Sequence, residues 1–183
     1  VTMKKLLAML LSAGVIISLC ACTSEDKKLT ENDEGLKQIS QKYENQYQTT
    51  ANIEYNGTKI KVNMEKTEEG STKIDFLEPA MLKGMAFEVS ENNIEVGYLG
   101  MHFNIDPNNL SSSIIVSTIV SAFNTMASGS GITAEVDGSA LNVTGTTNNA
   151  NFLLVLDKNS GNALKLEIPS MNLVAEFDSF TLN

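Results

Sequence analysis

The sequence predicts an α+β domain that is mostly β: an antiparallel sheet or barrel of about ten strands, with one helix before it and an apolar helix midway. Three observations support this prediction. Short segments of alternating apolar and polar residues recur between turn residues. Two longer segments have the helical period instead. No cysteine follows residue 22, so the core alone must hold the domain together.

The first 22 residues have the layout of a lipoprotein signal peptide. Lys4 and Lys5 precede a charge-free run, residues 6–19, which is shorter than the roughly 20 residues of a membrane-spanning helix. The run ends in Leu19-Cys20-Ala21-Cys22, which resembles the lipobox of bacterial lipoproteins. We expect residues 1–21 to be a cleaved signal peptide and Cys22 to carry the lipid anchor. The alternatives are an ordinary secretory signal and an uncleaved signal anchor.

Charge and length limit what the rest of the chain can do. Without Lys4 and Lys5, 11 lysines, no arginine and 22 acidic residues remain, a formal charge of −11. Such a surface disfavours nucleic-acid binding. Residues 22–28 are polar and charged, as expected of a tether between a lipid anchor and a folded domain. Residues 29–183 suit one domain with a sizeable core.

A helix and a hairpin are expected first. Residues 30–45 have helical periodicity, with Thr30 as the N-cap and Asp33 as its capping-box partner. Residues 47–55 and the segment from Ile60 to Met64 then alternate, and Asn56-Gly57 lies between them. This dipeptide suits a two-residue turn, because both central residues need positive φ, and it predicts a hairpin. Further strands are expected at 73–77, 81–90, 94–98 and 99–105, with a bulge or bend around Gly97 and Gly100.

A helix is expected to interrupt the strands near the middle of the chain. Asp106-Pro107 suits its start, residues 110–126 have its period, and no charged residue occurs between Asp106 and Glu135. We reject a second membrane span, because serines dilute the apolar run and strands flank it. The helix should therefore lie buried against the sheet. Strands resume at 132–136, 140–146, 151–157, 163–168 and 172–182.

Catalytic and metal-binding patterns are weak in this sequence. His102 is the only histidine, and no nucleophile-elbow pattern accompanies it. We expect it to point outward from a strand. One histidine and no thiol beyond Cys22 make a poor metal site. We therefore predict a protein that is not an enzyme and needs no cofactor.

Methionine usage favours an adaptable apolar interior. Met64, Met81, Met85 and Met101 fall in the early strands. Flexible, polarisable methionine side chains suit a cavity for varied apolar ligands. The alternative is that these residues simply fill a core.

This layout resembles the LolA/LolB-like superfamily of lipoprotein and lipid carriers. Local similarity lies in the segment Lys73-Ile74-Asp75-Phe76-Leu77-Glu78-Pro79 and in residues 87–98, two strands across a polar turn. The resemblance implies a half-barrel, meaning a strongly curved, incomplete barrel around an apolar cavity that holds acyl chains, with helices as its lid or plug. Because this chain has no arginine, arginine-based contacts of the family cannot be carried over.

The leading hypothesis is a membrane-tethered protein on the extracytoplasmic face that binds a lipid or other hydrophobic ligand. The rival is an envelope lipoprotein whose sheet binds another protein, and an enzyme using His102 ranks third. The expected cavity lining is Met81, Met85, Phe87, Tyr98, Met101 and Phe103 on the sheet, with Leu110, Ile114 and Phe123 on the central helix.

Overall fold

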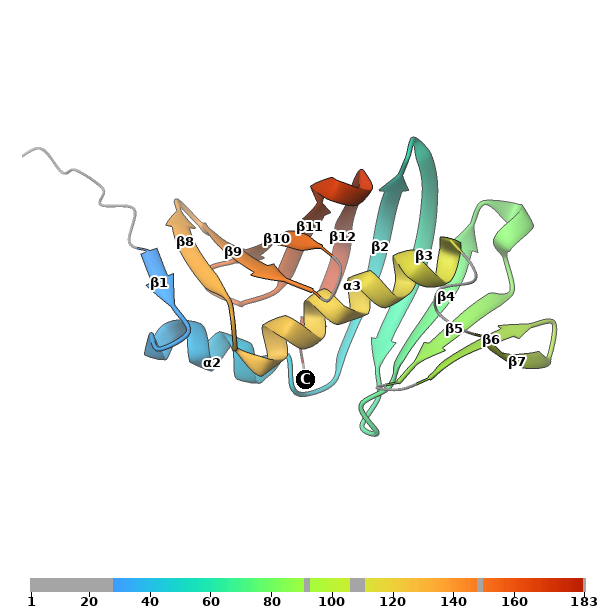
Figure 1. Ribbon diagram of the computed structural model, residues 1–183, viewed down its shortest axis with the longest axis horizontal. Coiled ribbons are helices and arrows are strands. Elements are labelled where there is room, and N and C mark those ends of the chain that lie inside the picture. Colours follow the sequence, from blue (N-terminus) through green and yellow to red (C-terminus); the bar gives the residue numbers. More distant parts are fainter. Residues whose placement is uncertain (1–27, 91–92, 106–110, 148–149, 183) are drawn as a thin grey trace, which may run out of the picture.

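Twelve strands form a single antiparallel sheet in the computed structural model, which describes residues 28–90, 93–105, 111–147 and 150–182. The sheet is curved and unclosed, and two helices accompany it (Figure 1), so the predicted fold class is confirmed. The strands are β1 (Lys28–Thr30), β2 (Tyr47–Tyr55), β3 (Thr58–Lys66), β4 (Thr72–Glu78), β5 (Met85–Val89), β6 (Ile94–Tyr98), β7 (Met101–Ile105), β8 (Thr133–Asp137), β9 (Ala140–Thr146), β10 (Asn151–Asp157), β11 (Ala163–Ile168) and β12 (Leu173–Leu182).

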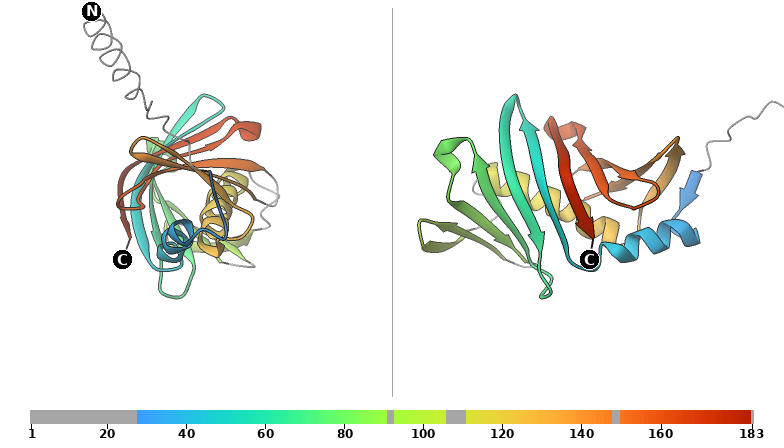
Figure 2. Two further views of the ribbon diagram at one scale, coloured as in Figure 1. Left: turned by 90° about the vertical axis from the view of Figure 1, so that its left-hand side faces the viewer. Right: turned by 180° about the vertical axis from the view of Figure 1, so that it is seen from behind.

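The sheet consists of two meanders that meet in its middle. Strands β2 to β7 follow one another in chain order, as do β8 to β12. The meanders join where β12 pairs antiparallel with β2, from Leu173 opposite Tyr55 to Leu182 opposite Tyr47. The short β1 pairs with β8, so β1 and β7 are the two edges of the sheet. Seen from one end, the sheet curls around the helices (Figure 2).

Helix α3 (Ser111–Ser128) lies on the concave side and contacts β5 of one meander and β9 of the other. The shorter α2 (Glu34–Lys42) packs against it. Among the residues described, no helix is long and apolar enough to cross a membrane. The expected burial of the charge-free helix is confirmed, because α3 has buried side chains around most of its circumference: Ser113, Ile115, Val116, Thr118, Ile119, Val120, Ala122, Phe123, Met126 and Ala127.

Five aromatic rings form the centre of the core where the meanders and both helices meet. Their centroids lie 5.3 to 6.5 Å apart in contacting pairs. The Tyr43 hydroxyl donates a hydrogen bond to the Gly161 carbonyl at 2.6 Å, and Lys66 Nζ donates to the Tyr43 carbonyl at 2.8 Å. The cluster comprises Tyr43, Tyr47, Phe123, Phe177 and Phe180.

The beginning of the domain differs from the prediction. The first helix begins at Glu34, not at residue 30, and Thr30 belongs to β1, a strand that the sequence did not predict. Asp33 directly precedes the helix, and its Oδ2 accepts a hydrogen bond from the Thr30 N–H at 2.7 Å. The two residues predicted to form a capping box therefore close the turn between β1 and α2. Residue 28, where the predicted tether ends, is the first residue of β1.

Two turns also replace predicted strand geometry. The expected strand 81–90 is wrong at its start, because residues 80–82 form a 3-10 turn and β5 begins only at Met85, after Gly84 at φ +89°. The expected bulge near Gly100 is a hairpin turn, in which Leu99 and Gly100 have φ values of 50° and 81°. The Asn56-Gly57 hairpin is confirmed, with φ values of 49° and 79°. The predicted helix start at Asp106-Pro107 lies outside the described residues.

Candidate apolar site at the open end of the sheet

The concave face of the sheet changes from buried to exposed over its last two strands. Phe87, Val96 and Phe103 are opposite one another across β5, β6 and β7, so their side chains share this face. Phe87 is 1% and Val96 8% exposed, whereas Phe103 is 52% exposed. The face that carries the core therefore continues to the edge of the sheet with its apolar side chains still exposed.

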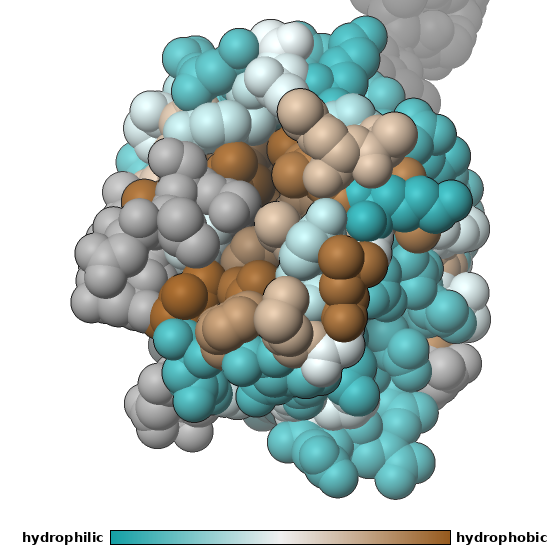
Figure 3. All heavy atoms as spheres, turned by 90° about the vertical axis from the view of Figure 1, so that its right-hand side faces the viewer, coloured by the Kyte–Doolittle hydropathy of each residue, from teal (hydrophilic) through white to brown (hydrophobic). Residues whose placement is uncertain are grey.

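A second row of side chains, nearer the hairpin turn, is more open. Met85, Tyr98 and Met101 are opposite one another, and Tyr98 and Met101 are 36% and 53% exposed. Ile114, near the beginning of α3, is 36% exposed. We call Met85, Tyr98, Met101, Phe103 and Ile114 the open-end patch. Figure 3 shows this end of the molecule, where apolar side chains gather in a hollowed area bordered by polar ones.

The open-end patch contains five of the nine predicted lining residues, and the other four lie elsewhere or outside the described residues. Met81 is 79% exposed and lies on the 3-10 turn at residues 80–82, at the same end of the molecule (Figure 1). Phe87 is packed beneath the patch in the core. Phe123 is 1% exposed and belongs to the central aromatic cluster, away from the patch. Leu110 lies outside the described residues.

Sequence reasoning missed one exposed apolar residue at this end. Leu99 is 74% exposed and occupies the first turn position between β6 and β7 with positive φ. Asparagine, aspartate and glycine are the residues that usually fill this position. Leu99 lacks this signal, so the sequence predicts a continuing strand 99–105 where the structure has a turn.

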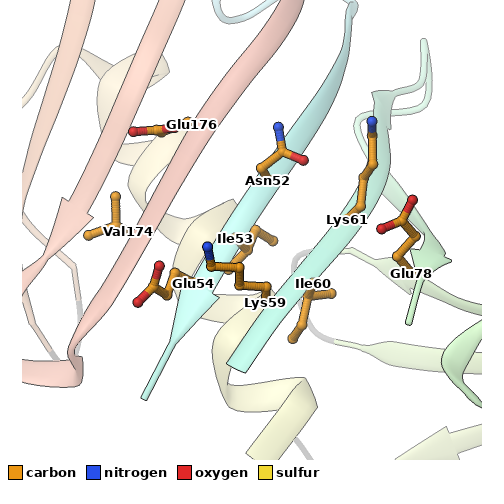
Figure 4. Close-up of a pocket in the computed structure, with 9 residues that line it drawn as sticks. All are labelled: Asn52, Ile53, Glu54, Lys59, Ile60, Lys61, Glu78, Val174 and Glu176. Carbon is orange, nitrogen blue, oxygen red and sulfur yellow. The ribbon is translucent and has the colours of Figure 1, made fainter. Parts of the chain in front are cut away.

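The convex face carries polar hollows that the sequence did not predict. One, of about 380 Å³, lies over β12, β2, β3 and the end of β4 (Figure 4). Nearby, Lys61 Nζ is 3.8 Å from Asp178 Oδ2. Most of the lining of this hollow is charged or polar, so it is unsuited to an acyl chain; the lining residues are Asn52, Ile53, Glu54, Lys59, Ile60, Lys61, Glu78, Val174 and Glu176.

His102 points outward from the sheet, as predicted. It lies on the convex face beside a smaller hollow of about 220 Å³. Its Nδ1 is 2.6 Å from Glu95 Oε1, and its ring lies alongside Gly97. Because successive strand residues point to opposite faces, His102 lies on the other side of the sheet from its neighbours Met101 and Phe103. In the described part of the chain, no three His, Cys, Asp or Glu side chains lie close enough together to hold a metal ion.

No protein-family model and no curated protein matches the chain. Several solved structures, however, match the chain. An uncharacterized conserved protein from Thermus thermophilus matches with 14% identity and a TM-score of 0.48 over 82% of this chain and 86% of that one. The MucA/MucB complex of Pseudomonas aeruginosa matches with 15% identity and a TM-score of 0.41, covering 80% of this chain and 55% of that one.

A LolA superfamily protein from Nitrosomonas europaea matches with 9% identity and a TM-score of 0.40, covering 81% of this chain and 93% of that one. These likenesses concern the layout of the fold alone. The solved structures similar to this chain thus include a member of the superfamily that its sequence resembles.

Proposed function

We propose that this chain is a binding protein for an apolar ligand with an acyl chain, and that the ligand lies on the open-end patch. The supporting observation is the continuity of the concave face, on which buried Val96 is followed by exposed Phe103 on the next strand. Monomeric proteins rarely leave large contiguous apolar areas in water, and such areas commonly mark binding sites. Covering this area stabilises the complex by roughly 25 cal/mol per Å² of apolar surface.

The composition of the open-end patch suits a ligand recognised by shape. Two of its five members are methionines, whose unbranched side chains adjust to ligands of different outline. The three residues of β7 on this face, Met101, Phe103 and Ile105, are all apolar. Few polar groups are therefore available to orient a headgroup, so the patch should select mainly by length and width of the apolar part.

We propose a binding role without catalysis. His102 is the one imidazole, and it lies on the convex face with Glu95, on the opposite side of the sheet from the patch. A general base must come within hydrogen-bond reach of the proton that it removes. A ligand on the concave face is out of its reach.

A lipid anchor at Cys22 would hold the domain at the extracytoplasmic face of the membrane. One acyl chain gives only marginal membrane binding, and lipobox processing attaches at least two. Cys22 precedes Lys28, the first residue of β1, by six positions, a reach of about 20 Å when extended. The domain would thus stay close to a source of acyl chains.

The test uses the mature chain with Cys22→Ser, so that no lipid is attached covalently. Native mass spectrometry with organic extraction should find a co-purified lipid, and a fluorescent fatty-acid probe should bind. Phe103→Asp places a charge on the patch and should weaken probe binding at least tenfold. Leu164→Asp is the matched control, because Leu164 is 45% exposed on β11, far from the patch. No extracted lipid together with no probe binding would refute the proposal, as would equal effects of the two variants.

A protein partner at the same patch is the second candidate. The observation that favours it is the tight packing of Phe87, 1% exposed, and Val96, 8% exposed, which fills the interior beside the patch. A filled interior with an exposed apolar surface is typical of a protein interface. In the experiment above, this candidate predicts no extracted lipid.

A further inference from the structure

Within its own five residues, the edge strand β7 has none of the charged or proline residues that commonly protect a sheet edge. Its sequence, Met-His-Phe-Asn-Ile, contains no proline, lysine, aspartate or glutamate, and all but its last residue are exposed. Natural edge strands are commonly short, charged or interrupted, because their unpaired backbone groups invite another strand. The opposite edge, β1, has such protection: it is three residues long and Lys28 pairs with Glu135 at 3.8 Å.

The hairpin that precedes β7 determines which of its backbone groups face outward. A two-residue turn with two positive φ values closes on a hydrogen-bonded pair, here Tyr98 and Met101. Because hydrogen-bonded pairs alternate along the ladder, Phe103 and Ile105 also bond toward β6. The N–H and C=O groups of His102 and Asn104 therefore point away from the sheet, and in the described chain only β6 pairs with β7.

We propose that β7 pairs antiparallel with β7 of a second copy of this chain, forming a two-fold symmetric dimer. Centring the pair on Phe103 places His102 of each copy opposite Asn104 of the other. These are the residues whose backbone groups face outward, so the register makes four inter-chain hydrogen bonds. It also uses all five residues of the strand, whereas a shift of two positions in either direction loses pairs.

The side chains of β7 are self-complementary in this register. On the concave face, Met101 meets Ile105 of the second copy and the two Phe103 rings meet each other. On the convex face, His102 meets Asn104, so no like charges oppose each other. This matters because the mature chain carries a formal charge of −11. The Glu95 carboxylate on the neighbouring strand β6 already contacts His102 at 2.6 Å.

A pairing of two five-residue strands is small, so the dimer should be reversible. Interfaces well below 1,200 Å² belong to weak or transient complexes. Confinement to a membrane surface through Cys22 would raise the effective concentration and favour the pair. The dimer would also join the two open-end patches along one apolar face.

The experiment is sedimentation equilibrium of the mature chain with Cys22→Ser over a wide concentration range. The Cys22→Ser chain with an unchanged β7 should show a concentration-dependent monomer–dimer equilibrium. The double variants His102→Lys/Asn104→Lys and His102→Glu/Asn104→Glu should each dimerise at least tenfold more weakly. Mixed with each other, they should form a one-to-one heterodimer, because each lysine then opposes a glutamate. Asn159→Lys/Ser170→Lys, at two exposed turns, is the control and should dimerise as the parent does.

Several results would overturn the β7 pairing. One is a parent chain that stays monomeric at every concentration, and another is a lysine variant that still dimerises. A mixture of the two charged variants that fails to associate would also overturn it. Species larger than a dimer would contradict two-fold pairing, because β7 joined to β1 of another copy would propagate into filaments. The charged side chains point to the convex face, so fatty-acid probe binding by these variants tests the proposed function separately.

Discussion

Tyr43 connects α2 to the second meander. Its ionisation at alkaline pH should lower the stability of the fold. Its buried hydroxyl donates to the Gly161 carbonyl, and burial raises the pKa of Tyr43 above its ordinary value of 10.0. Burial likewise raises the pKa of Tyr47 to about 12, although a hydrogen bond with Thr72 lowers it in part. Both rings lie in the central cluster, so the folded chain holds these tyrosines in the neutral form.

The first prediction concerns this pH dependence. The contribution of a group with a raised pKa is complete below the pKa of the unfolded chain, near 10, and is lost as pH rises toward the folded value. We expect the free energy of unfolding to fall between pH 10 and 12. Tyr43→Phe should cost about 1–3 kcal/mol at neutral pH, because the Gly161 carbonyl loses its donor, and it should make the alkaline fall shallower. Urea unfolding at several pH values measures both effects, and an unchanged alkaline slope would contradict the assignment.

Gly145 illustrates a glycine required by close packing. It pairs with Phe152 across β9 and β10, and a Cβ placed on it would lie 2.6 Å from Phe152 Cζ and 3.1 Å from Ile132 Cγ2. Phe152 is 3% exposed and has little room to move. We expect Gly145→Ala to lower the free energy of unfolding by about 1–3 kcal/mol through overpacking.

Gly35 in α2 is the matched control for Gly145. Nothing lies within 4 Å of a Cβ added there, and it has no positive φ. Gly35→Ala should raise the free energy of unfolding by about 0.5–1 kcal/mol, because alanine suits a helix better than glycine. Chemical denaturation measures both changes. If Gly145→Ala and Gly35→Ala shifted the free energy of unfolding in the same direction, the packing explanation for Gly145 would be wrong.

Among the elements, α3 is unusual because it carries no charged residue. This composition suits its position between the sheet and α2. A matched pair of lysine substitutions tests this environment. Val120 is 3% exposed, whereas Asn124 on the same helix is exposed. Val120→Lys should cost about 3 kcal/mol or more, because it buries an unpaired charge. Asn124→Lys should change stability by no more than about 0.5 kcal/mol. Thermal unfolding measures the loss of stability in both variants. Equal losses would contradict the burial of Val120.

Elements specified by local chemistry could be predicted from the sequence, and elements specified by distant partners could not. Asn56-Gly57 provides both positive φ values of its turn, and the absence of charge from α3 indicated its burial correctly. Strand β1 has only three residues and exists because β8 pairs with it, from 103 positions away at Thr30 and Thr133 to 107 positions away at Lys28 and Glu135. Nothing within Lys28-Leu29-Thr30 distinguishes a strand from the end of a tether.

The candidate site follows the same division. Alternation placed Met85, Tyr98, Met101 and Phe103 on one face of the sheet, as the register shows. It could not tell where α3 stops covering that face, because this depends on how the helix crosses the sheet. Phe123 was assigned to the lining for its size and period, but the rings of the central cluster surround it.

At the scale of the whole molecule, the two meanders produce an asymmetric sheet. One edge, β1, lies next to the segment that we propose as the membrane tether, and the other edge, β7, carries the open-end patch. These edges lie at opposite ends of the long axis (Figure 1). If Cys22 is anchored, the patch therefore lies at the end of the domain away from its attachment, where a second copy or a ligand can approach from the side.

The pairing of β12 with β2 also determines when the chain can finish folding. Asn52 and Asp178, hydrogen-bonded across this ladder, are 126 positions apart. Contacts so distant in sequence form slowly, because the closure of a long loop must precede them. Until β12 has been synthesised, β2 has no partner on one side and the meanders cannot join. If residues 1–21 are a signal peptide, as we propose, this late pairing would keep the chain unfolded until its synthesis is nearly complete, the state in which it can still be threaded across a membrane.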